Sequence, residues 1–121
     1  MRFQDLLAYK KSFALAMKIF EISKTFPKDE RYSLTDQIGR SSRSVSANIA
    51  EPYAKRLYPK YFINKLSNSD AENLETQVWM EYAMECQYIK KEIFDEMVSE
   101  SQEIGKLIYF MINNPEKCGS K

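Results

Sequence analysis

The chain has 121 residues, of which 44% are hydrophobic and 29% charged, and its net charge at neutral pH is +1. This length supports a single domain with its own core, and the near-neutral charge argues against the strongly basic class of nucleic-acid-binding domains. The chain contains no histidine, which removes the commonest acid–base catalyst and the commonest zinc ligand.

The scarcity of helix breakers, with three Gly and four Pro, favours a few long helices over many short strands. Cys86 and Cys118 make no disulfide framework, so we expect free thiols in a reducing cytoplasm. The N-terminal residues lack the apolar run of a signal peptide, and no segment approaches membrane-spanning length. We therefore expect a cytoplasmic protein with no membrane contact.

The first predicted helix spans about residues 4 to 25, and Pro27 lies just past its end. Its apolar residues recur at helical spacing, so that one face carries Leu6, Tyr9, Phe13, Met17 and Phe20. The second helix is expected to begin after Ser33, which can act as its N-cap, with Asp36 as a weak capping-box partner.

The second helix combines a thin apolar stripe with many small residues. The stripe is formed by Leu34, Ile38, Val45 and Ile49. The small residues bury little apolar area, so they favour the close approach of another helix; they are Gly39, Ser41, Ser42, Ser44, Ser46, Ala47 and Ala50. Polar residues flank the stripe, namely Arg40, Arg43, Asn48 and Glu51. Two interpretations stay open: a core helix with a solvated flank, or an assembly helix whose flank carries the function.

Pro52 conflicts with a continuous second helix, because proline removes one backbone hydrogen bond and costs about 3 kcal/mol in a helix interior. The helix either bends there or stops near Glu51 and restarts. The helix-tolerant composition of residues 53–56 favours a bend.

The third predicted helix begins at Pro59, which suits a first helical turn, and runs to about residue 89. Five of its residues are expected to face inward: Phe62, Leu66, Leu74, Val78 and Tyr82. A fourth helix covers about residues 92–112. Long helices with short connections predict an all-α, antiparallel up-down four-helix bundle over residues 1–113, followed by a flexible tail over residues 114–121.

Charge is unevenly distributed along the chain. Residues 31–65 contain seven Lys or Arg and two acidic residues, a net charge of +5, whereas residues 70–103 contain ten acidic residues and two Lys, a net charge of −8. The basic segment holds Lys55, Arg56, Lys60 and Lys65, interleaved with Tyr53, Tyr58, Tyr61 and Phe62. This composition is typical of a site that contacts the nucleic-acid backbone and stacks bases, but it also suits a solvated or inter-subunit contact.

Catalytic and metal-site patterns are absent from the sequence. No Glu-x-x-His pair, glycine-rich phosphate loop or nucleophile motif occurs, so we expect no catalytic residue, metal site or cofactor. Trp79 suits either an interface anchor or a core position.

Several short motifs resemble the bacterial four-helix bundle family, also called the ribosomal RNA intervening-sequence protein family. They are Asp5-Leu6, Phe26-Pro27, the segment 33–40, Asn48-Ile49-Ala50-Glu51 and Leu74-Glu75-Thr76-Gln77. The resemblance implies an antiparallel bundle that assembles into a ring-like homopentamer. Accessory proteins of diversity-generating retroelements, a related group, bind nucleic acid through a strongly basic surface. Pro52 and Gln87 stand where the resemblance leads us to expect Gly.

The resulting hypothesis is a non-enzymatic homo-oligomer, with RNA or another nucleic acid as partner. The predicted nucleic-acid contacts are Lys55, Arg56, Lys60, Lys65, Tyr53 and Tyr58. The predicted motif or assembly residues are Arg40, Arg43, Asn48, Glu51 and Trp79. Asn48 is expected to be partly buried and hydrogen-bonded, with Glu51 near Arg40 or Arg43. The alternatives are a protein–protein scaffold without a nucleic-acid role and, more remotely, a metal- or thiol-dependent enzyme.

Overall fold

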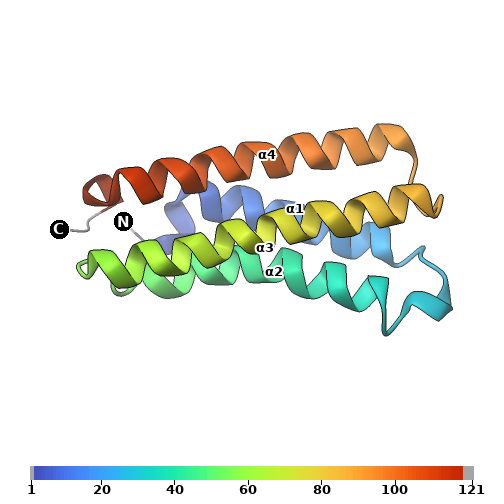
Figure 1. Ribbon diagram of the computed structural model, residues 1–121, viewed down its shortest axis with the longest axis horizontal. Helices are drawn as coiled ribbons and strands as arrows, with labels where there is room; N and C mark the ends of the chain where they lie inside the picture. Colours follow the sequence, from blue (N-terminus) through green and yellow to red (C-terminus); the bar gives the residue numbers. More distant parts are fainter. Residues whose placement is uncertain (1, 119–121) are drawn as a thin grey trace.

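The computed structural model describes residues 2–118, which form an all-α protein (Figure 1). Its four main helices are α1 (Leu7–Ser23), α2 (Leu34–Tyr53), α3 (Pro59–Glu85) and α4 (Lys91–Asn113). Three short 3-10 helices accompany them: η1 (Phe3–Asp5), η2 (Lys28–Glu30) and η3 (Pro115–Cys118). Successive helices run in opposite directions along the long axis, which confirms the predicted four-helix bundle.

The core lies between the four helices and follows the predicted stripe of α2. Leu34, Ile38, Val45 and Ile49 are all buried. Further apolar residues complete the core from the other helices, notably Leu15, Ile19, Phe62, Leu66, Met80, Met97, Ile104 and Ile108. None of the helices within residues 2–118 is long and apolar enough to cross a membrane.

Three of the five residues noted on the apolar face of α1 and three of the five predicted to face inward on α3 do not enter the core. Phe13, Met17 and Phe20 on α1 are between 38 and 50% exposed. The inward positions predicted for Leu74, Val78 and Tyr82 are wrong, because these side chains are between 47 and 56% exposed. On α1 the core takes a second face with smaller residues, namely Ala8, Ser12, Leu15, Ala16 and Ile19. On α3 it takes a face that includes the polar residues Ser69, Asn73 and Thr76.

A buried polar cluster joins α3 to α4. The Asn73 side-chain amide donates to the Ser101 carbonyl at 2.8 Å, and the Ser101 hydroxyl donates to the Asn73 side-chain oxygen at 2.9 Å. Gln77 donates to the Ser101 hydroxyl at 2.9 Å. Asn73 and Ser101 are almost fully buried, so these hydrogen bonds satisfy groups that water does not reach.

The small hydroxyl residues of α2 bring this helix close to α3. The Ser69 hydroxyl donates to the Val45 carbonyl at 2.7 Å, and the Thr76 hydroxyl lies 2.9 Å from that of Ser41. Ser41, Ser69 and Thr76 are buried. The predicted close helix approach therefore occurs within the bundle, between α2 and α3.

Ion pairs tie α1 to α4 on the surface. Lys18 lies 2.6 Å from Glu96 and 2.5 Å from Glu100, and Lys11 lies 2.6 Å from Glu103. Hydrogen bonds to Glu100 and Glu96 raise the pKa of Lys18, and the hydrogen bond from Lys18 lowers the pKa of Glu96. These side chains remain at least one-third exposed. We therefore expect the ion pairs to orient α1 and α4 and to contribute little to the free energy of unfolding.

The start of α2 is capped by a residue other than the predicted one. Ser33 occupies the N-cap position but makes no side-chain capping hydrogen bond. The Glu30 carboxylate instead accepts a hydrogen bond from the Leu34 amide at 3.3 Å and another from the Tyr88 hydroxyl at 2.8 Å. This second bond raises the pKa of Tyr88 to about 12 and joins the α1–α2 connection to the α3–α4 turn.

Helix α3 ends four residues earlier than predicted because the backbone turns left-handed at Gln87, where φ is 64°. The Gln87 amide donates to the Met84 carbonyl at 2.9 Å, and the Tyr88 amide donates to the Ala83 carbonyl at 2.8 Å. These two bonds form a Schellman motif, whose left-handed position favours glycine. Glutamine at this position therefore carries backbone strain.

Replacing Gln87 by Gly is expected to stabilise the fold by about 1 kcal/mol, because glycine adopts positive φ without a Cβ clash. Chemical denaturation of the wild type and Gln87→Gly measures the change. Gln87→Ala is the matched control and should bring no gain, since alanine keeps the Cβ. Equal stability of Gln87→Gly and the wild type would contradict the assignment of strain.

The C-terminal residues continue beyond α4. Residues Pro115–Cys118 form η3, and Cys118 packs against the core. Burial raises the pKa of the Cys118 thiol. Both cysteines are free. The rest of the predicted flexible tail, residues 119–121, lies outside the described residues.

Candidate nucleic-acid interface

The turn between α2 and α3 carries the predicted cationic residues. Helix α2 ends at Tyr53, one residue past Pro52, and residues 54–58 form the turn. The Lys55 amide donates to the Pro52 carbonyl at 2.8 Å, and the Arg56 amide donates to the Tyr53 carbonyl at 3.2 Å. The prediction that the helix continues through residues 53–56 after a bend is therefore wrong. Pro52 has no amide to donate to the Asn48 carbonyl, so the helix loses this hydrogen bond in its last turn and ends one residue later.

Two of the cations lie over one aromatic ring. The Lys55 ammonium is 5.3 Å from the centre of the Tyr61 ring, and the Lys65 ammonium is 5.9 Å from it. The Arg56 guanidinium lies 4.4 Å from the Tyr53 ring and donates to the Tyr53 carbonyl at 3.0 Å. We call Lys55, Arg56, Lys60 and Lys65 the basic corner.

The basic corner is not neutralised within the chain. Across residues 2–118, none of its four cations lies within ion-pair distance of a carboxylate. Lys55 and Lys60 are exposed, and Arg56 and Lys65 are half-buried. Four positive charges at one end of the bundle are thus available to an anionic partner.

The aromatic residues around the basic corner have different positions. Tyr58 is 67% exposed and offers a free ring face at the turn. Tyr53 is buried in the core, so little of its ring is accessible for stacking. Phe62 is fully buried, as its predicted core position requires.

Tyr61 is the ring that organises the corner, although the sequence analysis did not choose it as a site residue. Its hydroxyl donates a hydrogen bond to the Glu51 carboxylate. This bond favours the protonated phenol and raises the pKa of Tyr61. In the sequence, Tyr61 and Lys65 are four residues apart on a predicted helix, and this spacing already indicated that the two side chains are neighbours.

The motif residues of α2 fall into two groups. Asn48 is partly buried and donates to the Ser44 carbonyl and hydroxyl, both at 2.9 Å, which confirms its predicted environment. The predicted pairing of Glu51 with Arg40 or Arg43 is wrong within residues 2–118, where Glu51 accepts a hydrogen bond from Tyr61. Arg40 instead pairs with Asp36 at 3.0 Å.

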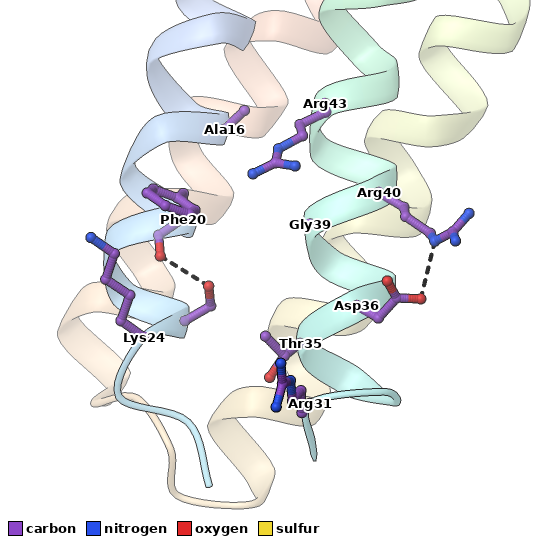
Figure 2. Close-up of a pocket in the computed structure, with 10 residues that line it drawn as sticks. Ala16, Phe20, Lys24, Arg31, Thr35, Asp36, Gly39, Arg40 and Arg43 are labelled. Atoms are coloured by element: carbon purple, nitrogen blue, oxygen red, sulfur yellow. Dashed lines mark hydrogen bonds and ion pairs between the residues drawn. The ribbon is translucent and has the colours of Figure 1, made fainter. Parts of the chain in front are cut away.

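Arg43 lines a cleft between α1 and α2, shown in Figure 2. Its guanidinium points towards α1 and lies 5.6 Å from the centre of the Phe20 ring. The Lys24 ammonium lies 4.6 Å from the same ring centre. A Cβ atom added at Gly39, on the α2 wall of the cleft, would meet nothing within 4 Å. The cleft therefore combines an exposed aromatic ring that two cations approach, the Arg40–Asp36 ion pair, the cation of Arg31 and open space at Gly39.

Trp79 packs partly buried against the core, with its ring centre 5.7 Å from that of Tyr82. Its indole nitrogen is buried and has no hydrogen-bond acceptor among the described residues. The predicted core position of Trp79 thus holds for the part of the side chain that packs against the core. No group of three or more His, Cys, Asp or Glu in residues 2–118 is placed to hold a metal ion.

Comparison with known proteins assigns the family. Residues 4–110 match the family described as 23S rRNA-intervening sequence protein. The chain belongs to this family. The match spans η1 to most of α4, so the basic corner and the cleft both lie within the region shared with the 23S rRNA-intervening sequence proteins.

A solved structure supports the same assignment. It is the crystal structure of a protein with unknown function from the S23 ribosomal protein family of Bacteroides thetaiotaomicron VPI-5482. The two chains are 30% identical, with a TM-score of 0.80, over 91% of this chain and 98% of the other. No curated protein matches the chain. The 23S rRNA-intervening sequence fold thus extends over almost the whole chain.

Proposed function

We propose that this chain is a non-enzymatic, cytoplasmic protein that assembles with copies of itself, as a pentamer, and binds RNA through the basic corner. The observation that carries the proposal is the unneutralised charge of Lys55, Arg56, Lys60 and Lys65 around an aromatic turn. RNA offers phosphates for the cations and bases for the exposed ring of Tyr58. The family description, which refers to 23S rRNA, supports RNA as the nucleic acid.

Self-assembly strengthens such a site. Each copy contributes only four cations, and phosphate contacts of this kind are weak at physiological salt. A closed oligomer repeats the basic corner, so one RNA strand that reaches several subunits gains from their effective concentration.

A direct test measures RNA binding and molecular mass on the same purified protein. Light scattering should give a mass several times 14.2 kDa. Fluorescence anisotropy should show binding to single-stranded and structured RNA of unrelated sequence. Affinity should fall steeply with salt, with a log–log slope of about −3 for each subunit engaged, because four neutralised phosphates release condensed counterions.

A protein scaffold without RNA is the second candidate, favoured by the exposed apolar residues of α1 and α3. An intact oligomer that binds no RNA at low salt would support the scaffold and overturn the RNA proposal. A stable monomer at micromolar concentration would overturn self-assembly.

A further inference from the structure

Two apolar surfaces of the chain have no partner within residues 2–118. The first, which we call the groove face, combines Phe13, Met17 and Phe20 of α1 with the small residues Gly39, Ala47 and Ala50 of α2. The second, the ridge face, is the outward stripe of α3 formed by Ala71, Leu74, Val78 and Tyr82. Large exposed side chains on both surfaces indicate protein contacts.

The shapes of the two faces are complementary. The α2 wall of the groove face carries the small residues Gly39, Ala47 and Ala50 beside Arg43, and a Cβ at Gly39 finds open space. The ridge face projects a leucine, a valine and a tyrosine at spacings of four residues along α3. A row of large side chains on one helix packs into a groove lined by small residues, as in ordinary helix packing.

The charges around the two faces are opposite. Arg43 stands in the groove face, and Lys24, which follows α1, lines the same cleft, where Arg40 pairs with Asp36. Lys10 is exposed on α1. Neither Arg43 nor Lys10 lies within ion-pair distance of a carboxylate among the described residues.

The ridge face has a negative border, formed by Glu75, Glu81 and Glu85 of the same helix. None of these three carboxylates forms an ion pair within residues 2–118. Charge complementarity therefore selects a second copy of this chain as the occupant of each face.

We propose that the groove face of one copy receives the ridge face of the next copy. This inference rests on the self-assembly part of the proposed function and deepens it by naming the two surfaces. Because different surfaces meet, the interface is heterologous, so repeated copies form a ring or an open filament rather than an isologous dimer. The basic corner belongs to neither face and remains available in the assembly.

Two single substitutions test this arrangement. Met17→Asp places a charge in the groove face, and Val78→Asp places one in the ridge face. Both side chains are nearly half exposed, at 46 and 47%, so the monomer should remain folded by circular dichroism. Each variant alone is expected to lose the oligomer and to show the monomer mass of 14.2 kDa.

Mixing the two variants tests the heterologous geometry. Met17→Asp keeps an intact ridge face and Val78→Asp keeps an intact groove face. In an equimolar mixture these two faces should meet, and the two altered faces should stop further growth. The product should be a dimer of about 28 kDa, twice the monomer mass. Phe110→Asp is the matched control, because Phe110 is 49% exposed on α4 and lies outside both faces. This control should keep the wild-type mass.

The inference is overturned if either single variant keeps the wild-type mass, or if the mixture stays monomeric at every concentration. RNA anisotropy provides a separate readout on the wild type. If the wild type is an oligomer but binds no RNA, only the RNA proposal is contradicted. If Met17→Asp remains an oligomer, only the proposed interface is contradicted. A monomeric wild type removes self-assembly and this interface together.

Discussion

Replacing Lys55 and Arg56 together by glutamate is expected to abolish RNA binding at physiological salt while the bundle stays folded. The two side chains lie in the turn after α2, outside the core, and neither pairs with a carboxylate in residues 2–118. Each lost contact between a cation and a phosphate is worth about 1.5 kcal/mol or more. The pair should therefore weaken binding on the order of 100-fold, before the added repulsion is counted.

The measurement is anisotropy across a salt series, with circular dichroism and light scattering as checks of fold and mass. The log–log slope should become about two units shallower for each subunit engaged. Lys90→Glu with Lys91→Glu is the control, because it changes the same number of charges at the α3–α4 turn, at the opposite end of the bundle (Figure 1). Equal loss in both double variants would show that only total charge matters and would contradict a site at the basic corner.

Asn73→Ala is expected to lower the free energy of unfolding by about 1–3 kcal/mol, because it removes both buried hydrogen bonds between Asn73 and Ser101. The buried Ser101 hydroxyl would lose the acceptor of its proton while keeping the bond from Gln77, and the Ser101 carbonyl would lose its side-chain donor. For a domain of this size, the melting temperature should fall by several degrees. Chemical denaturation, combined with a thermal melt, measures both quantities.

Asn68→Ala is the matched control, since Asn68 is exposed on the same helix. Its stability should change by less than about 0.5 kcal/mol. A double variant with Ser101→Ala should be less destabilised than the sum of the single changes, because the two residues share hydrogen bonds. Additive effects would show that the two side chains do not act as a unit.

The ends of the helices followed closely from local signals in the sequence. Pro59 begins α3 as expected, and Asn113 ends α4 where the polar residues cluster. The ends of α2 and α3 came earlier than predicted, at Tyr53 and Glu85, and the hydrogen bond at the start of α2 comes from an unexpected residue. Glu30 replaces Ser33 as the cap of α2, and Gln87 ends α3 through a left-handed backbone that local composition does not reveal.

The basic corner was predictable in composition but not in geometry. The sequence placed Lys55, Arg56, Lys60 and Lys65 near one another, since they surround a single turn. It did not distinguish exposed Tyr58 from buried Tyr53, nor show that Tyr61 lies between two lysines and Glu51. These differences depend on how α2 ends after Pro52 and on where α3 then packs.

By itself, the sequence determined the number, order and type of the helices, because helical periodicity and helix breakers are local properties of the chain. Only the tertiary structure decided which apolar stripe of a helix enters the core. Periodicity shows that Phe13, Met17 and Phe20 share a face, but Leu15 and Ile19 share another face that is also apolar. The core takes the stripe that fits closely against the neighbouring helices, and the larger side chains are left at the surface.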